Sequence, residues 1–144
     1  MLNAATSSGV WGNTSPNENV FTSAFNNVGN VIAYCFAEVA GFSKFGSYVG
    51  NGSNSGPTIN CGFEPAFVLI KRTNLSANWI LYDNKRDTTN PNSSVLIPNL
   101  SAAEITNAAD TIDFNSTSFQ LKSGMPSTNG SGDTFIYMAF ANQF

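Results

Sequence analysis

The stretch VIAYCFAEVAGFSKFGSYVGNG, residues 31–52, decides the fold class that we predict for this chain. It is a run of β-branched and aromatic residues with small residues between them and no helix cap, which favours buried strands over helices. A similar segment, FIYMAFANQF, lies at residues 135–144. Two similar strands that bracket the chain predict one closed domain in which the first and last strands lie near each other.

The two segments can be aligned residue by residue. Ile32, Phe36 and Ala37 match Ile136, Phe140 and Ala141 at a constant offset of 104 residues. The match predicts that the large members of both segments point into one core. These are Ile32, Phe36, Ile136 and Phe140.

From residue 20 onward, strand-like runs alternate with turn residues at short intervals, a pattern typical of antiparallel sandwiches and barrels. Turn clusters such as Gly50-Asn51-Gly52 and Asn90-Pro91-Asn92 separate the runs, because Gly and Asn tolerate positive φ and Pro presets a turn. The predicted strands cover residues 31–38, 42–49, 67–72, 79–83, 94–97, 111–114, 118–122 and 134–141.

Residues 101–109, SAAEITNAA, have helix character, with Ser101 as the N-cap and Glu104 as its capping-box partner. The predicted fold is therefore all-β: a single-domain, antiparallel, jelly-roll-like β-sandwich of about eight or nine strands with one short helical turn. Residues 20–144 form this domain. Residues 1–19 are polar and without a period, and they predict an extended N-terminal arm.

Charged residues make up 10% of the chain, while Asn, Ser and Thr supply 49 of its 144 positions. The net charge is −3, and the six basic residues form no stripe that could follow a phosphate backbone, so we expect no nucleic-acid binding. No apolar run reaches the length of a membrane span, and the N-terminus lacks a signal-peptide pattern. We therefore expect that the protein does not insert into a membrane. We also expect that it is synthesised in a cytoplasm.

The two cysteines, Cys35 and Cys61, predict buried reduced thiols, although the sequence leaves a bridge between them open. The chain contains no histidine, which removes the commonest general base and every Ser-His or Cys-His nucleophile arrangement. Paired carboxylates could cleave glycosides, but the chain lacks the length and the repeats of β-helical depolymerases. We predict no enzyme, no catalytic residue, no cofactor and no metal site.

Aromatic residues could form a platform for a sugar ring, and the candidates are Trp11, Tyr48, Trp79 and Tyr82. For Trp79 the apolar surroundings favour a place in the core. Trp11, in the arm, either packs on its own domain or inserts into a neighbouring subunit. Arg86 lies in the charged block YDNKRD, where it pairs with Asp83 or Asp87 to fix a turn, or contacts a glycan carboxylate or a partner chain.

Seven segments carry a family resemblance in their order and spacing: IAYCFAEVAGFSKFGSYVGNGS, GFEPAFVLIKRTN, WILYDNKRD, SAAE, IDF, SFQLKS and NGSGDTFIYMAFA. From about residue 20 to residue 140 the chain resembles a module of tail-fibre-like and other virion structural proteins of tailed bacteriophages, particularly marine ones. The resemblance implies a place on a virion surface and no particular reaction.

The expected function is therefore that of a non-enzymatic structural protein on the exterior of the particle. It would lie in a tail fibre or adsorption appendage, or in a head decoration or fibre. The expected partners are other copies of the chain, most plausibly in a homotrimer, and other virion proteins. The alternative is a glycan-binding module that recognises a host surface glycan during attachment.

Overall fold

The computed structural model describes residue 17, residues 19–22 and residues 34–142. The chain divides into two compact units, residues 1–36 and residues 37–144, and every described strand belongs to the second. The predicted arm, with Trp11, falls almost wholly outside the described residues, and the domain boundary predicted after residue 19 stays a prediction.

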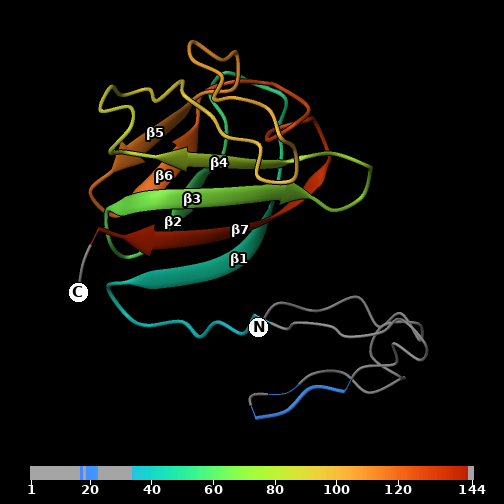
Figure 1. The fold of residues 1–144 in the computed structure, drawn as a ribbon, viewed down its shortest axis with the longest axis vertical. Coiled ribbons are helices and arrows are strands. Elements are labelled where there is room, and N and C mark those ends of the chain that lie inside the picture. Colours follow the sequence, from blue (N-terminus) through green and yellow to red (C-terminus); the bar gives the residue numbers. More distant parts are fainter. Residues whose placement is uncertain (1–16, 18, 23–33, 143–144) are drawn as a thin grey trace. The chain divides into compact units, whose positions relative to one another are not determined.

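Seven strands form two antiparallel sheets, and Figure 1 shows the larger sheet in front of the smaller one. The four-stranded sheet has the order β1-β7-β3-β4, with bounds Ser43–Val49, Thr134–Ala141, Pro65–Arg72 and Trp79–Asp83. The three-stranded sheet has the order β2-β6-β5, with bounds Thr58–Asn60, Ser118–Leu121 and Ile112–Asn115. The predicted all-β, two-sheet architecture is confirmed, with seven described strands rather than eight or nine.

The sequence locates most of these strands closely. β4 and β7 have the predicted bounds, and β1, β3, β5 and β6 differ from theirs by two residues or fewer. β2 was not predicted, because it is a three-residue strand with a single apolar side chain, Ile59. Two predicted strands are wrong: residues 34–38 are not in a strand, and within residues 94–97 only isolated bridges form.

The last strand pairs with β1 and not with the predicted first strand, residues 31–38, whose described part forms no strand. β1 runs antiparallel to β7, from the pair Ser43 and Phe140 to the pair Val49 and Thr134. β7 also pairs with β3 on its other side, so it lies in the middle of the sheet with both edges satisfied.

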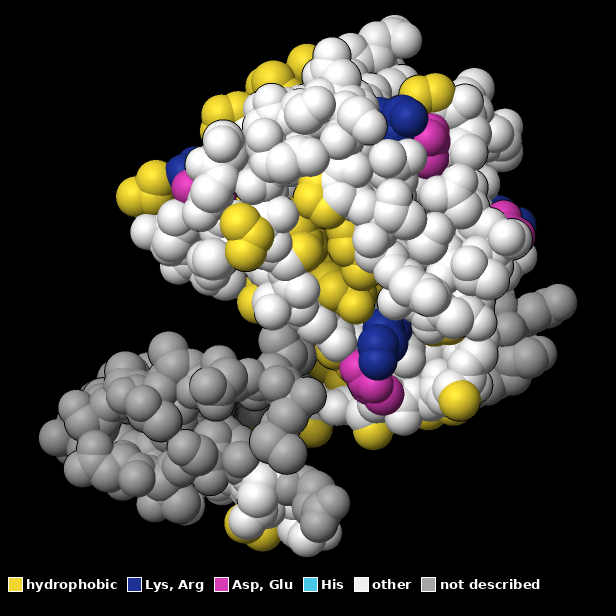
Figure 2. All heavy atoms as spheres, turned by 180° about the vertical axis from the view of Figure 1, so that it is seen from behind, with side chains coloured by type: hydrophobic (Ala, Val, Ile, Leu, Met, Phe, Trp, Pro, Cys, Tyr) yellow, Lys and Arg dark blue, Asp and Glu magenta, His cyan; other side chains and the backbone are white. Residues whose placement is uncertain are grey.

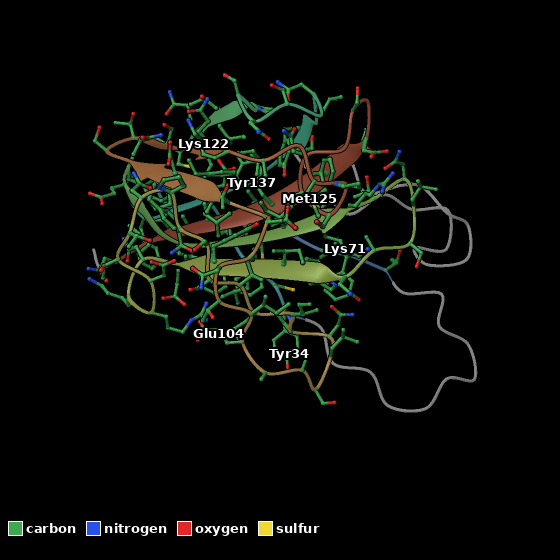
Figure 3. The ribbon with its side chains drawn as sticks, turned by 90° about the horizontal axis from the view of Figure 1, so that it is seen from above. Tyr34, Lys71, Glu104, Lys122, Met125 and Tyr137 are labelled. Carbon is green, nitrogen blue, oxygen red and sulfur yellow. The ribbon has the colours of Figure 1, made fainter. Side chains whose placement is uncertain are left out.

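The core lies between the two sheets and uses the face of β7 opposite to the one predicted. Phe135, Tyr137 and Ala139 are buried, whereas Ile136 and Phe140 lie on the outer face and are partly exposed. Seen from above, Tyr137 lies between the layer that carries Lys122 and the layer that carries Lys71 (Figure 3). Both faces of β7 carry apolar side chains. The alternation of residues along the strand therefore cannot show which of the two faces points inward.

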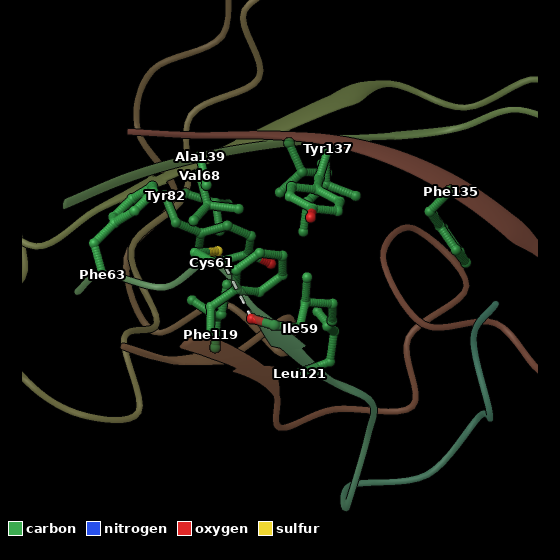
Figure 4. Close-up of a cluster of buried hydrophobic side chains, with 14 residues drawn as sticks. Ile59, Cys61, Phe63, Val68, Tyr82, Phe119, Leu121, Phe135, Tyr137 and Ala139 are labelled. Carbon is green, nitrogen blue, oxygen red and sulfur yellow. Dashed lines mark hydrogen bonds between the residues drawn. The ribbon is translucent and has the colours of Figure 1, made fainter. Parts of the chain in front are cut away.

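The first segment of the predicted core is also placed differently. Phe36 is 56% exposed, and Ile32 lies outside the described residues. Side chains from both sheets make up the observed core, as Figure 4 shows. Among its fully buried members are Val68, Ile70, Tyr82, Ile112, Phe119 and Leu121.

The predicted helical turn at residues 101–109 does not form. Ile105 exchanges two backbone hydrogen bonds with Val95, and the amide of Ala108 donates to the carbonyl of Ser93. The backbone groups that a helix would use internally are therefore paired with residues 93–95. The described residues contain no helix, and hence none long and apolar enough to cross a membrane.

Residues 92–96 connect the two sheets along one side of the sandwich. Leu96 forms a bridge with Leu81 in β4, and Asn92 forms a bridge with Ile112 in β5. On the other side, β1 and β2 are the outermost described strands of their sheets. The domain is thus a two-layer sandwich with β4 and β5 linked at one margin.

Candidate functional site

The outer face of the four-stranded sheet is the first candidate site. Antiparallel partners that lie directly opposite each other point to the same side of a sheet. The register therefore defines three rows of side chains that cross all four strands on this face, and a shorter row of Val49 and Thr134. The middle row contains Leu81, Leu69, Met138 and Phe45, and all four are partly buried. An apolar row therefore crosses all four strands. We call this surface the outer face.

The two flanking rows contain the charged residues of the outer face. One row holds Trp79, Lys71 and Ile136, and the other holds Asp83, Phe67 and Phe140. Lys71 donates to the carbonyls of Arg72 and Ala77, at 3.0 and 2.9 Å, and Asp83 pairs with Arg86. Both charges thus lie at the margin of the outer face, and its middle row carries none.

Phenylalanine rings cluster at one end of the outer face. The ring of Phe140 makes edge-on contacts with Phe42, Phe45 and Phe67, at centroid distances of 6.0, 5.6 and 5.7 Å. Edge-on pairs of this kind add to the stabilisation that the buried area provides. They also hold the four rings together in one cluster at this end of the outer face.

The second candidate site is a pocket of about 450 Å³ beside β4, which we call the Asp110 pocket. Its apolar wall consists of Ile80, Val95, Ile97, Ile105 and Met125, and its polar lining includes Arg72, Asn78, Asp110 and Ser127. β3 and β4 position Arg72 and Ile80, and the β3–β4 loop and the loops around residues 95–110 and 125–127 provide the rest. An apolar wall with a few converging polar groups is the usual composition of a small-ligand site.

Asp110 is the most deeply buried charged group of this pocket, with 8% of its surface exposed. One carboxylate oxygen accepts hydrogen bonds from Ser123 at 3.3 Å and Thr128 at 2.7 Å, and the other accepts one from Ser127. Among the described residues no lysine or arginine forms an ion pair with this carboxylate. Neutral hydroxyl groups therefore hold its negative charge.

Arg72 lines the same pocket with a partly satisfied guanidinium group. Its Nη2 lies 2.6 Å from a carboxylate oxygen of Asp133, and its Nη1 donates to the carbonyl of Pro126 at 3.4 Å. Its Nε is buried and makes no hydrogen bond to any described residue. The pocket thus combines a buried acceptor, a donor without a partner and an apolar wall.

The predicted contact residues are not brought together in one site. Trp11 lies outside the described residues. Tyr48 stacks on Phe135 and donates to the carbonyl of Thr128 at 2.6 Å, and Tyr82 is fully buried in the core. Burial raises the pKa of both tyrosines above the ordinary value. Arg86 is exposed and pairs with Asp83, as predicted, and also with Glu104.

The cysteines and the scattered charges complete the description of ionisable groups. Both cysteines are free thiols, as predicted, but only Cys61 is buried, while Cys35 is exposed. Burial raises the pKa of Cys61 to about 11. On the face seen in Figure 2, the Lys and Arg side chains lie mostly beside acidic ones rather than in a stripe. The described residues contain no group of three or more potential metal ligands.

The sequence did not point to the polar network around Asp110. Asn129 connects this network to the β1–β2 loop, since its side chain donates to Asn51, to the carbonyl of Ser53 and to that of Ser123. A weak signal exists in the segment SGMPSTNG, residues 123–130, which concentrates hydroxyl and amide side chains. Apart from the bond between Asn129 and the carbonyl of Ser123, these hydrogen bonds join residues 13 to 78 positions apart, so the pairing itself has no local pattern.

Comparison with known proteins assigns the chain to a family without naming an activity. No curated protein and no solved structure matches it. One family model matches residues 2–143, nearly the whole length of the chain. Its description is "Domain of unknown function (DUF7483)", and the protein belongs to this family.

Proposed function

We propose that the protein is a non-enzymatic structural protein on the exterior of a tailed bacteriophage virion. Its copies would associate through the outer face. The observation that carries the association is the uncharged middle row, which crosses all four strands of the sheet. A trimer is the assembly that we expect for a phage appendage.

The outer face has the composition of a protein interface. Interfaces combine an apolar, charge-depleted centre with a polar rim, and here Lys71 and Asp83 flank the uncharged row. Large apolar patches on a protein surface commonly mark interaction sites. Further copies of this chain are the partners that we infer, because outer faces arranged around a three-fold axis would cover one another's apolar rows.

The virion location rests on the sequence resemblance to tail-fibre-like and other virion structural proteins. The absence of histidine and the low charge of the chain are compatible with a structural role. A jelly-roll-like topology is part of the proposal, since the chain crosses between the sheets at β1–β2, β2–β3, β4–β5 and β6–β7. The particle could carry the protein on a tail appendage or as a head decoration.

Sedimentation velocity tests the association. The wild-type protein should sediment as an oligomer, and Leu69→Lys, which puts a charge in the middle row, should sediment as a folded monomer. Leu75→Lys is the matched control, since Leu75 lies in the loop between β3 and β4 and is already 58% exposed. A wild-type protein that stays monomeric at every micromolar concentration tested would refute the association.

Immunogold labelling of purified particles tests the location. We expect gold at regular positions on the tail or the head, and those positions would show which structure carries the protein. Particles that contain none of the protein would rule out the virion role and leave the oligomer as a separate finding.

A second candidate function is glycan binding during host attachment. The observation that favours it is the Asp110 pocket, which offers a buried acceptor, a buried donor and an apolar wall. A glycan array with the wild-type protein is the first test of this function.

A further inference from the structure

The Asp110 pocket lies on the core side of β4, because Ile80, which lines it, belongs to the inner face of that strand. The outer face is on the opposite side of the same sheet. A ligand in the pocket would therefore leave the proposed interface uncovered, and the two sites can be tested separately.

The carboxylate of Asp110 has room for one more donor. A carboxylate offers about four acceptor positions, and Ser123, Ser127 and Thr128 fill three of them. A hydrogen bond to an ionised group is stronger than one between neutral groups, especially in a buried site. A ligand hydroxyl that reaches the fourth position would therefore be bound firmly.

Arg72 requires the opposite kind of group from a ligand, a hydrogen-bond acceptor. Its Nε–H is buried and has no acceptor among the described residues, although Asp133 and Pro126 occupy the two other nitrogens. A buried donor without an acceptor is costly. A ligand oxygen would reach this N–H after a small movement of the surrounding side chains, and it would then remove that cost.

Together the two groups select a ligand that both donates and accepts, and the apolar wall selects one with a hydrocarbon face. A hydroxylated ring meets all three requirements, since its hydroxyl groups donate and accept while its C–H face packs on Ile80, Val95 and Ile105. A simple amine would meet only the requirement of Asp110, and a simple carboxylate only that of Arg72. The volume of about 450 Å³ lies within the ordinary range of small-ligand pockets.

We propose that the Asp110 pocket binds a neutral pyranose unit, with hydroxyl groups shared between Asp110 and Arg72. The inference rests on the second candidate function and names its site and ligand class. Asp110 is the only carboxylate in the described lining of the pocket, whereas glycoside cleavage requires two. The pocket would therefore bind the sugar without hydrolysing it.

The test is saturation-transfer NMR and calorimetry on the full chain. The probes are the methyl pyranosides of glucose, galactose and mannose, with those of glucosamine and glucuronic acid as charged comparisons. We expect at least one neutral glycoside to bind more tightly than either charged one. Tighter binding of a charged glycoside, or no binding of any of the five, would refute the proposal.

Two pairs of variants locate the site. Asp110→Asn should weaken binding by roughly tenfold or more, while Asp113→Asn, in β5 and paired with Lys122, should not. Ala109→Trp should block the pocket, since Ala109 is an exposed residue of its lining, while Ala102→Trp, exposed and outside the lining, should not. Ile105→Trp is a second blocking variant, since Ile105 is 43% exposed.

Melting temperatures show whether each variant is folded. Unchanged binding in folded Ala109→Trp and Ile105→Trp would place the sugar elsewhere and refute the proposal. If the proposal fails while the oligomer and the particle location are found, the structural function stands.

Discussion

Gly46 lies directly opposite Tyr137, and the tyrosine ring fills the space where a side chain of residue 46 would be. A β-carbon at residue 46 would lie 2.8 Å from both Cε1 and the hydroxyl oxygen of Tyr137. The ring cannot move away easily, because Tyr137 is buried and makes an edge-on contact with Phe119 at 5.3 Å. β1 therefore approaches the core only because residue 46 is glycine.

Gly46→Ala should lower the free energy of unfolding by about 1–3 kcal/mol, since the added methyl group overpacks the site. Urea denaturation measures the change. Ser47→Ala is the control, because Ser47 is exposed and points to the other side of the strand, where we expect a change within about 0.5 kcal/mol. Equal effects of the two substitutions would show that the Tyr137 ring does not restrict residue 46.

Removal of the hydroxyl group from two buried tyrosines should change the free energy of unfolding in opposite directions. The hydroxyl of Tyr82 is buried without a hydrogen-bond partner among the described residues, and nearby Thr128 directs its own hydroxyl to Asp110. Tyr82→Phe should therefore raise the free energy of unfolding by about 1 kcal/mol. Tyr48→Phe should lower it by a similar amount, because it removes the 2.6 Å bond to Thr128. Thermal denaturation measures the stability of both variants. A Tyr82→Phe variant that is less stable than Tyr48→Phe would contradict this prediction.

Neighbouring residues of β7 should differ sharply in their contribution to stability. Phe135 is fully buried, and Phe135→Ala should cost about 3–5 kcal/mol. Ile136 lies on the outer face, and Ile136→Ala should cost the folded monomer about 1 kcal/mol. Urea denaturation at low protein concentration separates the two values, and the reverse order would contradict the observed orientation of the strand.

Low pH should destabilise the loop in which the Asp87 carboxylate accepts several hydrogen bonds. This carboxylate accepts hydrogen bonds from the hydroxyl of Thr89 at 2.5 Å and from the amides of Thr89, Ser93 and Ser94. The hydrogen bond from Thr89 and those from the backbone lower the pKa of Asp87 well below its ordinary value. The stabilisation is therefore complete above the unfolded-state pKa of about 3.9 and is lost as the pH falls below it.

Melting temperatures between pH 7 and pH 2 measure this dependence. Asp87→Asn should melt below the wild type at pH 7, and the difference should shrink below about pH 4. Asp113→Asn, which removes a partly exposed pair with Lys122, should change the melting temperature little at any pH. A difference between Asp87→Asn and the wild type that is constant with pH would contradict the role of the ionised carboxylate.

Local sequence patterns were sufficient to predict several features of this protein. β4 and β7 have the predicted bounds because runs such as WILYD and TFIYMAFA combine high strand propensity with turn residues on both sides. A strand from the first part of the domain was predicted to lie near β7, but residues 43–49 rather than residues 31–38 supply that strand. An ion pair of Arg86 with Asp83 or Asp87 was predicted from the charged turn, and the pair with Asp83 forms.

Other features depended on contacts between distant parts of the chain. SAAEITNAA has the caps of a helix, yet Val95 and Ser93 take its backbone hydrogen bonds. The polar groups of the Asp110 pocket likewise come from segments far apart in the sequence.

The sequence by itself determined that this protein is an all-β chain and where most of its strands begin and end, because propensity and turn chemistry act over a few residues. Only the tertiary structure decided that Phe135, Tyr137 and Ala139, rather than Ile136 and Phe140, face the core. Both faces of β7 are apolar, so the choice was made by the sheet that covers one of them. The other face of β7 is part of the outer face, on which the proposed assembly depends.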